Sequence, residues 1–251
     1  MTTVDAILLS IGGSSGVLLI AAFLGRSWME VLVSKALETH KAQLDQQSKA
    51  QERAADLAVI MMHYQGPFLW AVYDLQSRLY NIIANNLIGK YWINGDEYER
   101  DYVVNHTVFV LGQYFAWSEI IRHDVQFIDC QDRVKTARLS DLKHRIYHLF
   151  QTDELPGRFR LWSGEQRAVG EALIEVHDGK RGVMGYGPFL ERFALDTSTF
   201  FLRLKADVES LATGCVDTLD RLSAIQHALV DMLDFLDPDC QQFDAHHRLR
   251  V

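Results

Sequence analysis

Two adjacent cations, Lys180 and Arg181, lie inside a glycine-rich segment, DGKRGVMGYGPFLERF, which begins at Asp178. Backbone amides at the start of a helix, combined with two cations, can hold a phosphate or a lipid headgroup. We therefore take Lys180 and Arg181 as a candidate anion-binding site. The alternative is a flexible connection between two helices, because the segment lacks the GxxxxGK[ST] spacing of a P-loop.

Two histidines at a spacing that metal sites use are His144 and His148, which share one face of a predicted helix. Each lies two residues from a predicted core position, a rotation of roughly 200° on a helix. We therefore expect both imidazoles to face solvent, with no metal bound. Glu119 and His123 have the same four-residue spacing and are expected to pair on the polar side of their helix.

Acidic residues follow one face of the last long predicted helix, with one histidine among them: Asp217, Asp220, His227, Asp231 and Asp234. Such a face can bind a divalent cation or a basic partner, but its position opposite the leucines predicts a solvated outer surface. It becomes an interface if subunits pack against it. Because GxSxG, HExxH, paired CxxC and GxGxxG are all absent, we expect no catalytic residues and no cofactor.

The overall composition excludes one class of partner. The chain has 33 Asp and Glu against 25 Lys and Arg, a net charge of −8, whereas general nucleic-acid binding needs a basic surface. Apolar residues make up 48% of the chain, enough for a sizeable core. The three cysteines, Cys130, Cys215 and Cys240, are odd in number and far apart, as expected for ordinary thiols in a reducing compartment.

The N-terminal run AILLSIGGSSGVLLIAAFLG has no charge between Asp5 and Arg26. It is the element expected to decide where in the cell the rest of the chain lies. At about 1.5 Å per residue, a helix of this length crosses the roughly 30 Å core of a bilayer. We therefore predict a transmembrane anchor at residues 1–26. Because Lys and Arg follow the run but do not precede it, the N-terminus is expected outside and the remaining chain in the cytoplasm, at the inner (plasma) membrane.

Within this run, Gly12 and Gly16 form a GxxxG pair. Small residues at that spacing let two helix backbones approach closely in lipid, so they predict a homo-oligomer. The alternative is chance, because glycine is common in membrane helices.

The rest of the chain predicts an all-α protein. Residues 27–65 lack Gly and Pro and are expected to form a helical stalk that ends at Gly66-Pro67. Residues 66–251 are expected to form a cytoplasmic helical bundle without β structure. Its later helices are predicted at about 134–151, 164–177, 187–195, 198–212 and 215–236. Gln113 falls on an apolar row of the central helix and is expected to have a hydrogen-bond partner.

The order of an apolar span, the sequence WMEVLVSKALETHKAQLD and a long polar helix resembles the start of many uncharacterised bacterial membrane-anchored proteins, over residues 1–55. The resemblance implies a single-span, cytoplasm-facing protein and no activity. We therefore expect a membrane-anchored scaffold or interaction protein with the lipid bilayer, its own copies and another protein as partners. The alternatives are a membrane-bound sensor or effector that binds an anionic small molecule or lipid headgroup, and an enzyme with an unfamiliar site.

Overall fold

The computed structural model describes residues 35, 37–49, 51–52, 64–124, 133–195, 198–213 and 216–251. Two compact units divide the chain, Met1–Asp56 and Leu57–Val251. The predicted anchor at 1–26, with Gly12 and Gly16, lies outside the described residues. None of the helices in the described ranges is both long and apolar enough to cross a bilayer.

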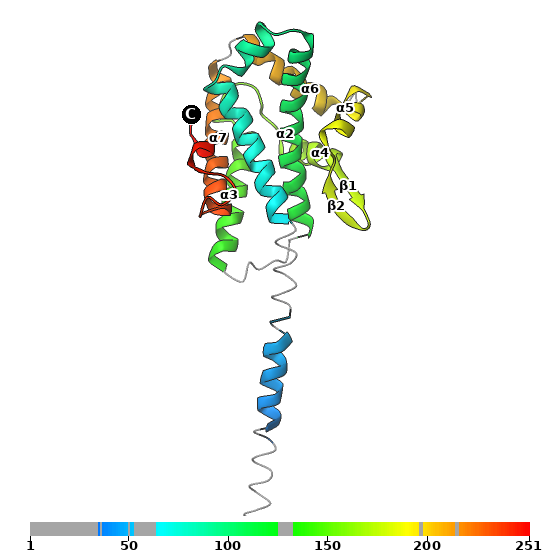
Figure 1. Ribbon diagram of the computed structural model, residues 1–251, viewed down its shortest axis with the longest axis vertical. Helices are drawn as coiled ribbons and strands as arrows, with labels where there is room; N and C mark the ends of the chain where they lie inside the picture. Colours follow the sequence, from blue (N-terminus) through cyan, green and yellow to red (C-terminus); the bar gives the residue numbers. More distant parts are fainter. Residues whose placement is uncertain are drawn as a thin grey trace, which may run out of the picture. The chain divides into compact units, whose positions relative to one another are not determined.

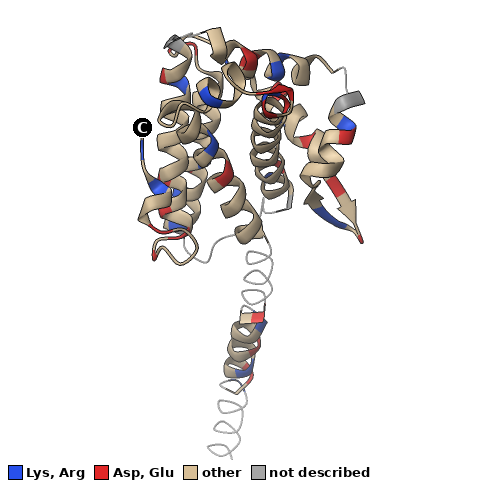
Figure 2. Ribbon diagram, turned by 45° about the horizontal axis from the view of Figure 1, so that its top comes forward, with Lys and Arg blue, Asp and Glu red and all other residues tan. Residues whose placement is uncertain are grey.

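In the first unit, the described residues between 35 and 52 are helical, as predicted for this part of the stalk. All of these side chains are exposed, including Leu37 at 69% and Leu44 at 52% of their surface. Charged residues of both signs follow the same helix (Figure 2). The apolar side chains at positions 37 and 44 therefore have no covering partner within the described residues.

The second unit is built on four helices that run alongside one another: residues 64–83, α2 (Glu97–Asp124), α3 (Arg133–Gln151) and α7 (Val216–Leu236) (Figure 1). Aromatic side chains join them in the core. The ring centroids of Phe68 and Tyr114 are 6.1 Å apart, and those of Phe115 and Phe150 are 5.0 Å apart. Burial of the apolar stripe of each helix is the main source of stability in such a bundle. The predicted all-α bundle is confirmed at this level.

A second layer packs on α2 and consists of α4 (Ser163–Leu173), α5 (Tyr186–Leu195) and α6 (Thr199–Ser210). The short 3₁₀ turn Leu211–Thr213 continues α6. Gly170 allows α4 to approach α2 closely, since a Cβ there would lie 2.8 Å from the backbone of Phe115. Further along α2, Phe109 contacts Phe189 at 5.3 Å between ring centroids. The second layer therefore extends the hydrophobic core beyond the four long helices.

The expectation of no β structure is wrong at one place. The helix predicted at 164–177 ends at Leu173, and the chain continues as an antiparallel hairpin of β1 (Ile174–His177) and β2 (Lys180–Val183). The turn residues Asp178 and Gly179 have φ of +52° and +76°. Two positive φ values suit the tight right-handed twist of a two-residue hairpin, for which Asp-Gly is a strong signal.

The predicted helix break at Gly66-Pro67 is also wrong, because residues 64–83 are helical without interruption. Phe68, Ala71 and Val72, just after the proline, are almost completely buried. Their burial in the core stabilises this helix around the position of the proline.

The C-terminal segment covers the acidic face of α7 that was expected to be solvated. Asp231 accepts hydrogen bonds from Arg250 at 2.7 Å and from Arg145 of α3 at 2.6 Å. His227 Nε2 donates to the carbonyl oxygen of Val251 at 2.6 Å, and the chain nearby forms a 3₁₀ turn, Ala245–Arg248. Asp220, nearer the start of α7, is exposed as predicted. The second half of this face of α7 therefore packs against the C-terminal segment of the same chain, and its carboxylates are paired with arginines.

One fully buried arginine holds the end of α3. Arg221 of α7 donates to the carbonyl oxygens of Leu149, Phe150, Thr152 and Leu155. The last carbonyls of a helix have no partner within the helix, so this guanidinium supplies the donors that the chain end lacks.

Candidate ligand-binding cleft

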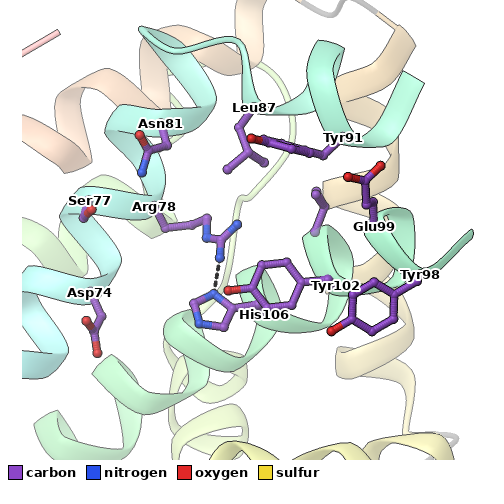
Figure 3. Close-up of a pocket in the computed structure, with 11 residues that line it drawn as sticks. Asp74, Ser77, Arg78, Asn81, Leu87, Tyr91, Tyr98, Glu99, Tyr102 and His106 are labelled. Atoms are coloured by element: carbon purple, nitrogen blue, oxygen red, sulfur yellow. Dashed lines mark hydrogen bonds between the residues drawn. The ribbon is translucent and has the colours of Figure 1, made fainter. Parts of the chain in front are cut away.

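A cleft of about 430 Å³ opens between the helix of residues 64–83, the π-helical turn η1 (Ile88–Ile93) and the first half of α2 (Figure 3). Its volume falls in the range of small-molecule sites. Polar, charged and aromatic side chains line most of its wall: Asp74, Ser77, Arg78, Asn81, Leu87, Tyr91, Tyr98, Glu99, Tyr102, Val103 and His106.

The turn into α2 fixes one wall of the cleft. Asp96 Oδ1 accepts the backbone N–H of Glu99 at 2.8 Å, and Glu99 Oε2 accepts that of Asp96 at 3.1 Å. This reciprocal capping box defines where α2 begins. Arg100 then ties the helix to η1 by donating to the carbonyl oxygens of Trp92 at 3.1 Å and Gly95 at 2.9 Å. A π-helical turn is rare and often occurs at a functional site.

The central charge of the cleft is Arg78, of which only 8% is exposed. Its guanidinium donates to Nδ1 of His106, the hydrogen bond drawn in Figure 3. Because arginine can only donate, Nδ1 is the acceptor, and the neutral imidazole carries its proton on Nε2. Burial and the nearby charge of Arg78 lower the pKa of His106 to about 4, so the ring is neutral at pH 7. Burial also lowers the pKa of Arg78, against opposing effects of Tyr102 and other neighbours.

Asp74 lies one helical turn before Arg78, a spacing at which acid and base commonly pair. Among the residues that the structure describes, however, no carboxylate lies within ion-pair distance of Arg78. The only hydrogen bond drawn between the lining residues joins Arg78 to His106 (Figure 3). Burial raises the pKa of Asp74, while the charge of Arg78 partly opposes this shift. Both charged groups therefore line the cleft without a direct contact between them.

Three tyrosines line the same cleft, with 46% of Tyr91, 78% of Tyr98 and 42% of Tyr102 exposed. Tyr102 stacks on His106 with 5.0 Å between ring centroids, and Arg78 Cζ lies 5.5 Å from the Tyr102 ring centre. Tyr186 of α5 contacts the other side of this group, at 5.3 Å from the His106 ring. Exposed aromatic rings beside a buried cation suit a ligand that has an anionic group and a flat apolar part.

The cations proposed from the sequence lie elsewhere. Lys180 and Arg181 are exposed on β2, opposite His177 and Val176 of β1, and they do not line the cleft. Figure 2 shows this strand as a basic segment on the hairpin. They belong to a strand, so the helix-start geometry expected for the segment does not apply to them.

The other candidate residues from the sequence lie outside the cleft. His144 and His148 are exposed, as predicted. Glu119 and His123 are 3.9 Å apart, but Glu119 is only 6% exposed and is held 2.7 Å from Arg122, so the predicted solvated pair is half buried. Among the described residues, the buried Oε1 of Gln113 has no hydrogen-bond partner, contrary to prediction. Within the described ranges, no group of three His, Cys, Asp or Glu residues is placed to hold a metal ion.

This cleft was not predicted from the sequence, although the spacing of its residues is a signal for it. Tyr98, Tyr102 and His106 follow one another at four-residue spacing and so share one face of α2. Arg78 interrupts an apolar stripe formed by Leu75, Leu79 and Ile82. A charge inside a core stripe and an aromatic row on the next helix together indicate a polar pocket between two helices.

No protein-family model, curated protein or solved structure matches this chain in the comparisons made with known proteins.

Proposed function

We propose that this protein is a membrane-anchored sensor or effector whose helical bundle binds a small organic anion in the Arg78 cleft. The anchor is the uncharged run within residues 1–26, with the bundle on the cytoplasmic side. The observation that carries the binding function is the state of Arg78: a nearly buried guanidinium in a cleft, bonded to a neutral imidazole and within ion-pair distance of no carboxylate in the described part of the chain.

Burial of the Arg78 charge costs free energy unless a partner stabilises it. A buried cation is stable when it is paired and fully hydrogen-bonded, and the neutral partners His106 and Tyr102 leave the Arg78 guanidinium without a charged partner among the described residues. An anion in the cleft would supply that partner through charge-assisted hydrogen bonds. Asn81 and Ser77 on the same helix can donate further hydrogen bonds to it.

Titration calorimetry on the full-length protein in detergent tests the proposal. The probes are inorganic phosphate, adenosine monophosphate and 3-phenyllactate. We expect binding of at least one probe, weakened about tenfold or more in Arg78→Gln and unchanged in a double variant, Lys180→Ala with Arg181→Ala. Loss of binding in the hairpin double variant, with Arg78→Gln unaffected, would move the site to β2 and overturn the proposal.

A scaffold function remains the second candidate, favoured by the exposure of Leu37 and Leu44 on the stalk helix. Exposed leucines on one helix favour contact with another helix of the same kind. Both functions require the anchor. Washing membranes with alkaline carbonate should leave the protein in the pellet, and its release into the supernatant would exclude a spanning anchor.

A further inference from the structure

The charged residues of the cleft indicate which chemical class of ligand it binds. We propose that the ligand is a small zwitterion, an inference that rests on the proposed function. Its carboxylate binds Arg78, its ammonium group binds Asp74, and its flat side chain lies among the tyrosines. An aromatic α-amino acid has this chemistry.

Asp74 and Arg78 lie on the same helix of the cleft but do not pair with each other. Acid and base at i and i+4 on a helix are neighbours and commonly form an ion pair. Here Arg78 turns to His106 of α2 instead, and the Asp74 carboxylate has no hydrogen bond or ion pair with any described residue. Two opposite charges therefore stand on one wall of the cleft, each without a charged partner. One molecule that carries both charges satisfies both.

The acidic side chains of the cleft exclude strongly charged anions as its ligand. Two carboxylates, Asp74 and Glu99, line the cleft together with a single guanidinium. Glu99 Oε2 already accepts the Asp96 N–H, so the charge of Glu99 is held in place at the start of α2. A nucleoside triphosphate would bring several negative charges close to these two acids, and like charges repel in a partly buried site. A zwitterion adds no net charge to the cleft.

Three tyrosines form an aromatic wall of the cleft. The rings of Tyr98 and Tyr102 lie side by side on α2, and Tyr91 lies across from them on η1 (Figure 3). Tyrosine faces attract ammonium groups through their quadrupole, and they stack with flat rings. Since Tyr98 is 78% exposed, part of this surface is available to a ligand in the structure.

Three probes of similar shape measure how much each charge of the ligand contributes to binding. L-phenylalanine carries both charges, 3-phenyllactate replaces the ammonium with a hydroxyl, and 2-phenylethylamine lacks the carboxylate. Titration calorimetry on the full-length protein at pH 7 should give L-phenylalanine an affinity at least about tenfold above that of 3-phenyllactate, a difference of about one charge-assisted hydrogen bond. 2-Phenylethylamine should bind more weakly than L-phenylalanine by a similar factor.

Variants assign each charge to its residue. Asp74→Asn should remove the advantage of L-phenylalanine and leave 3-phenyllactate bound as tightly as before, while Arg78→Gln should weaken both acids about tenfold or more. Asp101→Asn, at an exposed position of α2 that does not line the cleft, is the matched control and should change neither affinity. Thermal unfolding of each variant confirms that the cleft is still formed.

The outcomes separate the two proposals. If both acids bind equally, with a loss in Arg78→Gln and no change in Asp74→Asn, the zwitterion inference is wrong while the anion-binding function stands. If a phosphate-bearing probe binds through Arg78 and L-phenylalanine does not, the inference is also wrong. If none of the probes binds, or if Arg78→Gln changes nothing, both proposals fail.

Discussion

Arg248 Nη2 lies 2.6 Å from Asp237 Oδ2, and only 7% and 6% of the two side chains are exposed. Asp237 also accepts the backbone N–H groups of Gln241, Gln242 and Phe243. Burial by itself would raise the pKa of Asp237, but these N–H groups and Arg248 together hold it below the ordinary value. This pair therefore joins the C-terminal segment to the end of α7.

We expect Asp237→Asn to lower the free energy of unfolding by about 1–3 kcal/mol, because it removes the buried charge that Arg248 contacts and leaves Asp234, 52% exposed, as the charged partner of this guanidinium. Urea unfolding of the protein checks this value. Asp239→Asn, two residues away at an exposed position, should stay within about 0.5 kcal/mol of the wild type. Equal losses of unfolding free energy in the two variants would mean that the Asp237–Arg248 pair does not stabilise the fold.

Two glycines of the same helix, α4, should respond in opposite ways to alanine. At Gly170 a Cβ would lie 2.8 Å from the backbone of Phe115, so Gly170→Ala must push α4 away from α2 and cost about 1–3 kcal/mol. At Gly164 a Cβ would meet nothing within 4 Å, and alanine should be neutral or stabilise by up to about 1 kcal/mol. Thermal unfolding of both variants provides the comparison, and a stabilised Gly170→Ala would contradict the close approach of the two helices.

His106 should make the stability of the bundle sensitive to acid. Its pKa is about 4 in the folded protein, against 6.5 for an ordinary histidine. Between these values the unfolded chain binds more protons than the folded protein, so stability falls as the pH drops from 6.5 towards 4. His106→Gln should lose less stability between pH 7 and pH 5 than the wild type, as measured by urea unfolding at both values.

The control for this experiment is His144→Gln, at an exposed position of α3, which should keep the pH dependence of the wild type. Asp74, whose pKa is raised, acts in the opposite direction, since its folded form binds more protons. The comparison of each variant with the wild type cancels that contribution. If His106→Gln kept the pH dependence of the wild type, this result would contradict a neutral, half-buried imidazole.

Gly12 and Gly16 lie outside the described residues, and their role stays a prediction from the sequence. Leucine at either position would block close approach of two membrane helices, so Gly12→Leu and Gly16→Leu should reduce the mass of the detergent-solubilised protein measured by light scattering. Gly13→Leu, on a different face of the helix, is the control and should keep the mass of the wild type. A monomeric wild type would remove the assembly argument.

The sequence by itself determined where most of the helices of the bundle lie. The apolar residues of 134–151 and 215–236 repeat with the helical period, and the structure forms helices at Arg133–Gln151 and Val216–Leu236. Such periodicity is local, because each helix must bury one stripe whichever element covers it. The same reasoning correctly placed His144 and His148 in solvent. The hairpin was missed because four-residue strands are too short to show an alternating pattern, although Asp178-Gly179 is a turn signal.

Only the tertiary structure decided which polar groups meet. Asp231 lies on the outer face of α7, as its position predicted, but Arg250 and Arg145 reach it from segments 19 and 86 residues away in the chain. Arg78 and His106 are 28 residues apart, and nothing local shows that the guanidinium turns to this ring instead of Asp74. Helix periodicity specifies a face and not the partner on that face, because the partner depends on how the helices pack. The cleft and its unpaired charges therefore depend on how the helix of residues 64–83, η1 and α2 pack against one another.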